Sequence, residues 1–136
     1  MREIKFRGMR ISDGEWVYGD LLHIVGGYVI YHGSQTESQL IEGRPNVAIE
    51  LYMDEVSPVF PETVGQYTGL HDEDGREIYE GDIVRTSVAK DAIGVVEWNN
   101  DQASFVVHMK GRTQCYPLSK SDKIIGNIHD NPELLR

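Results

Sequence analysis

The chain has few of the residues that mark exported, disulfide-stabilised or membrane proteins. Its 136 residues include a single cysteine, Cys115, so no internal disulfide can form. No apolar run approaches the roughly 20 residues that a membrane-spanning helix needs. Residues 1–6 lack the apolar core of a signal peptide. These absences predict a protein of the reducing cytoplasm with no membrane partner.

Basic clusters are absent as well. The chain has 13 Lys and Arg against 22 Asp and Glu, a formal net charge of −9, and no run of three basic residues. This balance disfavours binding to a nucleic-acid backbone, which needs a clustered Lys/Arg surface. An acidic surface is more typical of solubility or of a basic protein partner. The prediction would change if the scattered basic residues gathered on one face: Arg2, Lys5, Arg7, Arg10, Arg76 and Arg85.

Metal-binding and nucleophile motifs are also missing. Neither Cys-x-x-Cys nor His-x-x-x-His spacing occurs among Cys115 and the five histidines, which are His23, His32, His71, His108 and His129. A nucleophilic Cys115 would need an adjacent base and a lowered pKa, so an inert thiol in a strand is the favoured interpretation. We therefore predict no metal, no cofactor, no catalytic residues and no enzymatic activity.

The acidic run Asp72-Glu73-Asp74-Gly75 suggests a calcium loop or a hairpin turn. A calcium-binding EF-hand loop needs a bidentate glutamate at its twelfth position, followed by a helix. Counted from Asp72, that position is Ile83, and the flanking residues are typical of strands. A solvated hairpin turn is therefore favoured.

One hairpin pattern occurs twice in the chain. Residues 6–22 correspond to residues 67–84 at an offset of 61 positions, which becomes 62 after the extra residue Glu80. Residues 125–128 repeat the pattern of residues 64–67 at the same offset. A duplicated unit whose last strand lies beside its first would explain these matches. Two unrelated hairpins that share turn chemistry are the alternative.

A Gly-Asp pair stands in each copy, Gly19-Asp20 and Gly81-Asp82. The two acids could form a catalytic pair, or each Asp could bond nearby backbone amides in a turn. Repetition favours the turn. We expect equivalent corners of two units to hold the carboxylates farther apart than the roughly 5–9.5 Å of paired-carboxylate glycosidases.

Apolar alternation and turn residues predict a mostly β fold. Strands are expected at 3–11, 15–24, 28–31, 47–53, 63–70, 76–87, 93–98, 103–109, 114–118 and 123–129, with a loop at 33–46 and a helix start at 130–135. Prolines 58 and 61 mark a boundary, because proline interrupts sheet ladders. The predicted organisation is an N-terminal β unit over residues 1–60 and a small barrel or sandwich over residues 61–136.

Four aromatic residues suggest either a peptide-binding groove or core packing: Trp16, Trp98, Tyr79 and Phe105. Packing is the commoner role of aromatic side chains in a small β core. The groove is nevertheless the functional hypothesis that the sequence supports best.

Six segments of the chain form a recognisable set. They are Arg2-Glu3-Ile4-Lys5-Phe6-Arg7, residues 61–70 with Asp74-Gly75, Ile78-Tyr79-Glu80-Gly81-Asp82-Ile83-Val84, Gly94-Val95-Val96-Glu97-Trp98, Ile125-Gly126-Asn127-Ile128 and residues 131–135. Together these segments resemble the YopX family of phage-associated proteins. Only residues 24–55 depart from the pattern. The resemblance implies phage or prophage origin, an SH3-like barrel in the C-terminal part and homo-oligomer formation. It implies no activity, since the family has none assigned.

Two functional hypotheses follow. The first is a non-enzymatic, homo-oligomeric phage accessory protein that acts through contacts with phage or host proteins in the bacterial cytoplasm, with residues 33–46 as the first place to expect subunit contacts. The second is a nucleic-acid-binding barrel in phage replication or gene expression, whose exposed aromatics would stack bases. The net charge of −9 stands against the second hypothesis.

Overall fold

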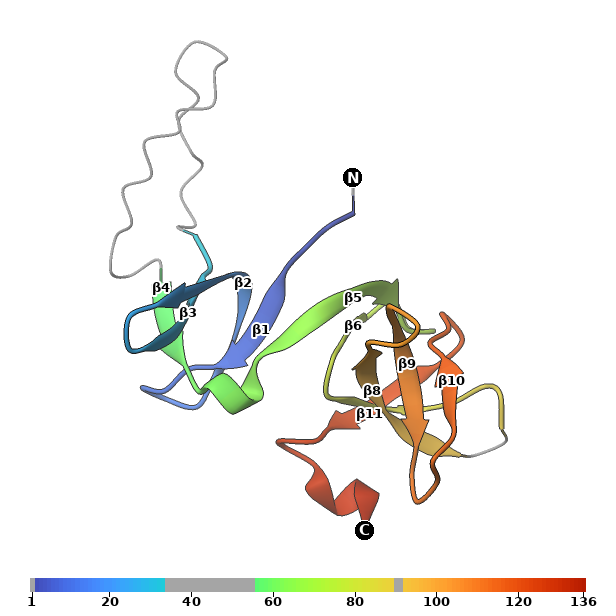
Figure 1. Ribbon diagram of the computed structural model, residues 1–136. Coiled ribbons are helices and arrows are strands. Elements are labelled where there is room, and N and C mark those ends of the chain that lie inside the picture. The colour runs from blue at the N-terminus through green and yellow to red at the C-terminus, as the bar shows by residue number, and fades with distance from the viewer. Residues whose placement is uncertain (1, 34–55, 90–91) are drawn as a thin grey trace. The chain divides into compact units, whose positions relative to one another are not determined.

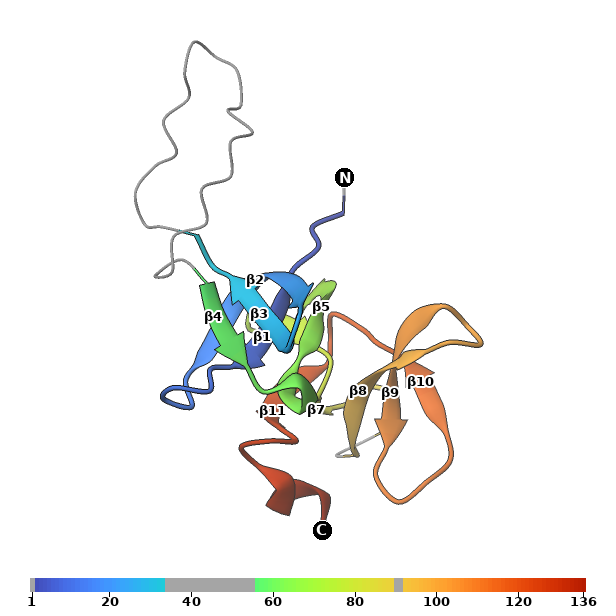
Figure 2. The ribbon, with the colours of Figure 1, turned by 60° about the vertical axis from the view of Figure 1, so that its left-hand side comes forward.

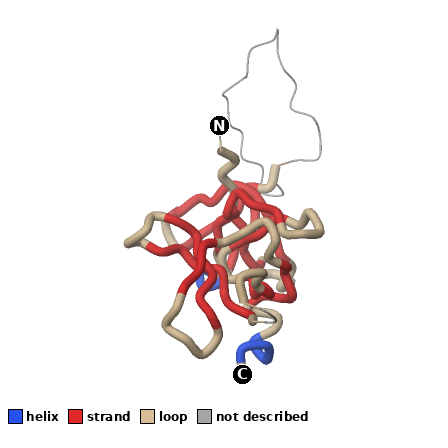
Figure 3. Tube along the Cα trace, turned by 90° about the vertical axis from the view of Figure 1, so that its right-hand side faces the viewer, coloured by secondary structure: helices blue, strands red, loops and turns tan. Residues whose placement is uncertain are grey.

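The protein is mostly β, as the sequence predicts. The structure, a computed structural model, describes residues 2–33, 56–89 and 92–136 (Figure 1). The described strands are β1 (Phe6–Met9), β2 (Trp16–Ile24), β3 (Gly27–Tyr31), β4 (Val56–Val59), β5 (Gly65–His71), β6 (Glu77–Tyr79), β7 (Asp82–Arg85), β8 (Ile93–Asn99), β9 (Ser104–Met109), β10 (Cys115–Pro117) and β11 (Lys123–Asn127). They form two antiparallel sheets. The described helices are short 3₁₀ turns, Pro61–Thr63 and Pro132–Leu135 (Figure 3).

The chain divides into two compact units. One is Lys5–Val64, and the other combines Met1–Ile4 with Gly65–Arg136. The loop expected at 33–46 lies outside the described residues from position 34 onward, and the strand expected at 47–53 lies outside them entirely. Within the described ranges, no helix has the length and apolar character to cross a bilayer.

The Lys5–Val64 unit is built from strands β1 to β4, ordered β4-β3-β2-β1. Alternation along these strands points every second side chain to one face, which buries Val17, Ile30 and Val59 as a small core. Gly8 allows β1 to lie close to β4, since a Cβ at this position would come within 3.0 Å of Val59 Cβ. The missing side chain at Gly8 therefore lets β1 pack against β4 beside this core.

The two prolines near the predicted boundary behave differently. Pro61 begins a 3₁₀ helix and ends strand pairing, as expected. Pro58, in contrast, lies inside β4 opposite Val29, and its carbonyl accepts a 3.0 Å bond from the amide of Ile11. Proline at this position is compatible with pairing because it lacks only a donor and keeps its acceptor.

The larger unit contains the β5–β6 hairpin and a five-stranded sheet ordered β10-β9-β8-β7-β11 (Figure 2). Five of its buried residues form one core cluster: Ile78, Val84, Val96, Val107 and Met109. The single strand predicted at 76–87 is two strands, because residues 80–81 form a turn between β6 and β7.

A closed SH3-like barrel is not confirmed, because this sheet is open with β10 and β11 at its ends. Side chains bond the outer edge of β11. The amide of Ile124 donates to Asp72 Oδ2 at 3.1 Å, and its carbonyl accepts from Arg76 at 2.8 Å. Farther along, the amide of Asn127 donates to Asn131 Oδ1 at 3.2 Å. These bonds occupy positions where a further strand would pair to close a barrel.

The internal repeat is not confirmed either, because the two hairpins differ in register and turn. Tyr18 pairs with Arg7 in the first hairpin, whereas the corresponding Tyr79 pairs with Tyr67, the counterpart of Phe6. The first turn closes with the amide of Arg10 bonded to the carbonyl of Glu15, and the second with Asp72 bonded to Arg76. In addition, β11 pairs with β7 rather than with β5. The shared Asp-Gly residues therefore reflect a common use of glycine at positive φ in turns (Gly14 at 74° and Gly75 at 83°).

Candidate functional site

An aromatic pair forms one side of a shallow pocket in the larger unit. Trp98 on β8 and Phe105 on β9 are register partners, so their side chains lie on the same face of the sheet. Their rings meet edge to face, with centroids 5.0 Å apart and planes at 71°. The indole N–H donates to Asn100 Oδ1 at 2.7 Å, which holds Trp98 in place while 43% of it stays exposed. A half-exposed tryptophan of fixed orientation is a ready contact surface.

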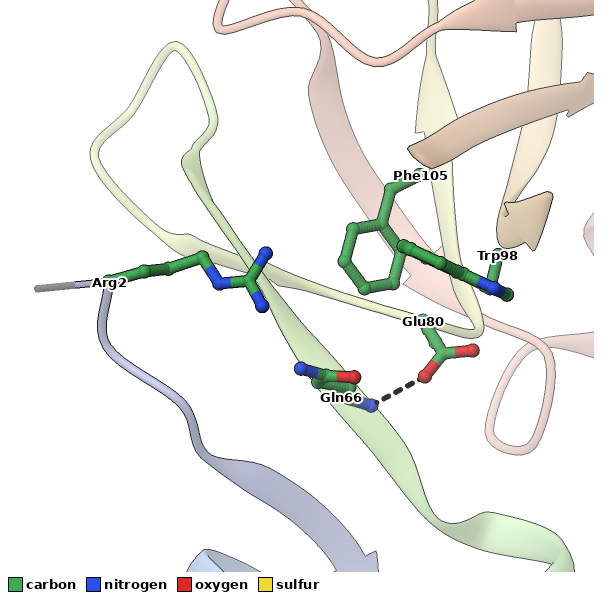
Figure 4. A pocket seen from close by; sticks show the side chains of 5 residues that line it. All are labelled: Arg2, Gln66, Glu80, Trp98 and Phe105. Atoms are coloured by element: carbon green, nitrogen blue, oxygen red, sulfur yellow. Dashed lines mark hydrogen bonds between the residues drawn. The ribbon is translucent and has the colours of Figure 1, made fainter. Parts of the chain in front are cut away.

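The polar side of the pocket comes from β5 and the turn after β6. The backbone N–H of Gln66 donates to Glu80 Oε1 at 2.9 Å, and the backbone N–H of Glu80 donates to the backbone carbonyl of Gln66 at 3.0 Å. The neighbouring residue must be glycine, because a Cβ at Gly65 would lie 2.5 Å from the Glu80 carbonyl oxygen. This close approach places the Glu80 carboxylate at the edge of the aromatic pair (Figure 4).

Arg2 completes the lining. Its side chain points from the N-terminal segment toward the pocket (Figure 4). The cavity of about 260 Å³ is lined by Arg2, Gln66, Glu80, Trp98 and Phe105. Small-molecule sites are typically about 300–1,000 Å³ and bury most of their ligand. A smaller, open pocket with an aromatic side and opposite charges at its rim suits one side chain of a protein ligand better.

The groove hypothesis, which the sequence left as the alternative to core packing, therefore holds for only two of the four aromatic residues. Trp98 and Phe105 lie together, but Tyr79 is 1% exposed and packs edge to face against Tyr67 in the interior. Trp16 belongs to the smaller unit, where the guanidinium of Arg7 lies 4.8 Å from its ring centroid. The sequence pattern did not assign Arg2, Gln66 or Glu80 to this groove. The one signal that could have indicated them is the extra residue Glu80, which has no counterpart in the first hairpin.

The acidic run beginning at Asp72 forms a turn, as predicted. Asp72 Oδ1 accepts from the amides of Asp74 and Arg76, both at 2.9 Å, and Oδ2 accepts from Ile124. Burial acts to raise the pKa of Asp72, but these backbone bonds and the Arg76 guanidinium outweigh it and lower the pKa below 3.8. The buried carboxylate thus joins the turn to β11.

The two Gly-Asp pairs occupy different environments. Asp20 is exposed within β2, opposite Tyr31. Asp82 is 2% exposed at the start of β7, and its Oδ2 accepts the Tyr79 amide at 2.8 Å. Asp82 therefore has the turn role predicted for both, and Asp20 does not. The two residues belong to different compact units.

A third buried aspartate, Asp122, was not singled out by the sequence. It is 1% exposed and accepts from the Ser87 amide at 3.1 Å and the Ser119 amide at 3.0 Å. Its own carbonyl accepts from Glu73. Asp122 therefore anchors two loops of the larger unit from within.

The histidines do not assemble a metal site. Across residues 2–33, 56–89 and 92–136, no three His, Cys, Asp or Glu side chains are placed to hold an ion. His23 stacks on Tyr28 at 4.4 Å, and His32 Nε2 lies 2.9 Å from Ser57 Oγ. These contacts are structural.

Cys115 is exposed in β10, and its register partner on β9 is His108. A cysteine facing a histidine could suggest a nucleophile with its base. However, His108 Nδ1 lies 3.2 Å from Glu97 Oε2, and Nε2 lies 2.8 Å from the Arg112 carbonyl oxygen. Both partners accept, so the ring serves both only when each nitrogen carries a proton. The hydrogen bond to the Arg112 carbonyl has the largest effect and that to Glu97 the next largest, and both raise the pKa of His108. An imidazolium held in this way is a poor base for the thiol.

Several of the basic residues considered for nucleic-acid binding are engaged within the fold. Arg7 is 7% exposed against Trp16, Arg10 pairs with Asp13 at 3.3 Å, and Arg76 pairs with Asp72 at 3.4 Å. The charges of Arg10 and Arg76 are therefore partly offset by neighbouring carboxylates, and the guanidinium of Arg7 is buried against an aromatic ring.

Comparison with known proteins places this small all-β protein in a family. Residues 5–136 match the model described as YopX protein, and the chain belongs to the YopX family. Among solved structures it is similar to "protein EF1440 from Enterococcus faecalis", with a TM-score of 0.56 and 21% sequence identity over 100% of each chain. At this identity the likeness shows the fold alone. No curated protein matches the sequence.

Proposed function

We propose that this protein is a non-enzymatic, homo-oligomeric protein-interaction module that serves as a phage or prophage accessory protein in the bacterial cytoplasm. The observation that carries the proposal is the pocket beside Trp98 and Phe105. Tryptophan and arginine are enriched at the energetic centres of protein interfaces, and this pocket presents both beside a carboxylate. The buried aspartates support a non-enzymatic role, since Asp72, Asp82 and Asp122 already bind backbone amides.

The proposal is tested by light scattering coupled to size-exclusion chromatography over a micromolar concentration range. The wild-type protein is expected to show a molar mass above that of one 15.4 kDa chain. Trp98→Ala is expected to shift this mass toward the monomer. The change should leave the fold intact, because Trp98 is 43% exposed. A wild-type protein that stays monomeric at every concentration would contradict the proposal.

Val88→Ala provides a matched control for the loss of an exposed apolar side chain. Val88 is 55% exposed and does not line the pocket. Its replacement should leave the mass distribution of the wild type unchanged. If Val88→Ala and Trp98→Ala act alike, the pocket is not the contact site.

Nucleic-acid binding is the second candidate, since Trp98 and Phe105 could stack bases beside Arg2. The net charge of −9 and the internal pairing of Arg7, Arg10 and Arg76 weigh against it. Fluorescence anisotropy with labelled single- and double-stranded oligonucleotides at low salt decides between the two. Binding that is abolished by Trp98→Ala would favour this candidate, and no binding at about 20 mM salt would exclude it.

A further inference from the structure

The lining of the pocket includes one residue from a segment far away in the sequence. Residues 2–4 are exposed and lie outside any strand, yet Met1–Ile4 belongs to the larger unit, whereas Lys5 begins the smaller one. From this segment the Arg2 side chain points toward Glu80, Phe105 and Trp98 (Figure 4). Arg2 therefore has the position of a ligand side chain entering the pocket.

The chemistry of the pocket suits a guanidinium group. A planar cation stacks on an aromatic face and pairs with a carboxylate, and Trp98 and Glu80 offer both within one small cavity. The volume of about 260 Å³ admits one long side chain rather than a folded element. The pocket thus selects for a single arginine on an extended segment.

Charge makes a second copy of this chain a suitable source of that segment. The first ten residues contain four Lys and Arg against one Glu, in a chain whose formal net charge is −9. The N-terminal segment of one copy is therefore attracted to the acidic remainder of another. Any contact that an exposed segment makes within its own chain can also be made to an identical chain, which is the basis of exchange between protomers.

We propose that the N-terminal segment of a second copy binds this pocket through Arg2, so that two protomers exchange segments and each completes the other's site. This inference rests on the proposed homo-oligomeric function and names the contact that carries it. The exchange is reciprocal, with two identical Arg2-to-pocket contacts in each dimer. Removing either side of the contact removes both copies of it.

The test uses the full chain with two variants that damage opposite sides of the contact. Arg2→Gln keeps the pocket and impairs the segment, and Trp98→Ala keeps the segment and impairs the pocket. Sedimentation equilibrium should show that each variant raises the dissociation constant of the dimer at least about tenfold, the scale of a central interface residue. Lys120→Gln removes an exposed charge that does not line the pocket and should leave the dissociation constant unchanged.

Mixing the two variants is the decisive measurement. A mixed dimer retains one intact contact, between Arg2 of the Trp98→Ala chain and the pocket of the Arg2→Gln chain, whereas neither variant alone retains any. The equimolar mixture should therefore associate more tightly than either variant by itself. Glu80→Gln keeps an oxygen that can accept the backbone N–H of Gln66 but removes the negative charge. This variant should therefore weaken the dimer without disrupting the structure around the pocket.

The alternative outcomes are distinct. A wild-type monomer at all concentrations would overturn both this inference and the proposed function. Wild-type association that Arg2→Gln leaves unchanged would overturn the inference alone and place the interface elsewhere. Weakened variants that fail to complement each other in the mixture would show that Arg2 acts within its own chain, which also overturns the exchange.

Discussion

Replacing Asp72 with asparagine tests whether a buried carboxylate holds the larger unit together. The side chain is fully buried, and its two oxygens accept three backbone amides, those of Asp74, Arg76 and Ile124. Asparagine has nearly the same shape but only one acceptor oxygen. If that oxygen keeps the two bonds in the turn, the amide NH₂ must face the Ile124 N–H, so donor meets donor. The substitution thus removes the link to β11 and the negative charge together.

The expected loss is about 2–3 kcal/mol in the free energy of unfolding at pH 7. A hydrogen bond to a charged group contributes roughly 1.5–3 kcal/mol, and the Ile124 amide left without an acceptor places the result toward the upper end. Urea denaturation measures the loss, and amide hydrogen exchange at Ile124 should locate it to β11. Asp74→Asn is the control, because Asp74 is about half exposed and its ion pairs are long, at 3.8 and 3.9 Å. It should change stability by less than about 0.5 kcal/mol.

The pH dependence of the same variant provides an independent check. Because folding lowers the pKa of Asp72 below 3.8, its carboxylate contributes stability that is fully present above pH 3.8. That contribution is lost as the pH falls through the lower pKa of the folded state. The stability difference between wild type and Asp72→Asn should therefore shrink in strong acid. A difference that does not depend on pH, or that equals the effect of Asp74→Asn, would refute the reasoning.

Two further predictions concern the sheet and the pocket. The pKa of His108 is raised above 6.5 by the Arg112 carbonyl and by Glu97, so the stability that the protonated ring contributes should be complete below pH 6.5 and lost as the pH rises through the higher pKa of the folded state. NMR titration should show an elevated pKa that Glu97→Gln reduces. An unshifted pKa would contradict the two hydrogen bonds assigned to the His108 ring. Gly65→Ala should destabilise the larger unit by about 1–3 kcal/mol in urea denaturation and reduce association, because the new Cβ would meet the Glu80 carbonyl oxygen at 2.5 Å. Wild-type stability in Gly65→Ala would show that the backbone relaxes freely.

The strands that the sequence predicted correctly are those set by local chemistry. Alternation and turn residues placed β2 and β8 to within about one residue, since both features act between neighbours in the chain. The errors arise where distant segments decide the outcome. The turn at residues 80–81 divides a predicted strand in two, and Pro58 remains in a strand because its carbonyl still accepts the amide of Ile11, which lies far away in the sequence.

The same limit applies to the candidate site. Trp98 and Phe105 were among the predicted aromatics, and because they face each other across a hairpin they meet locally. Arg2, Gln66 and Glu80 come from other segments, so only the assembled fold brings them to the pocket. Local pattern likewise predicted the turn at Asp72 but not its burial, which depends on Ile124, 52 positions away.

The buried aspartates show the structural role of acidic side chains in the larger unit. A carboxylate that accepts several amides is held in its charged form by those donors, and its lone pairs are directed away from any ligand. Asp72 is held in this way, and the Asp82 and Asp122 carboxylates also accept backbone amides of the larger unit, although acid-rich turns can equally suggest calcium or catalysis. Glu80 differs, because its carboxylate lies at the rim of a pocket beside an exposed indole. The position of a carboxylate relative to solvent and to aromatic surface, rather than the local density of acidic residues, is therefore the feature on which the proposed contact site rests.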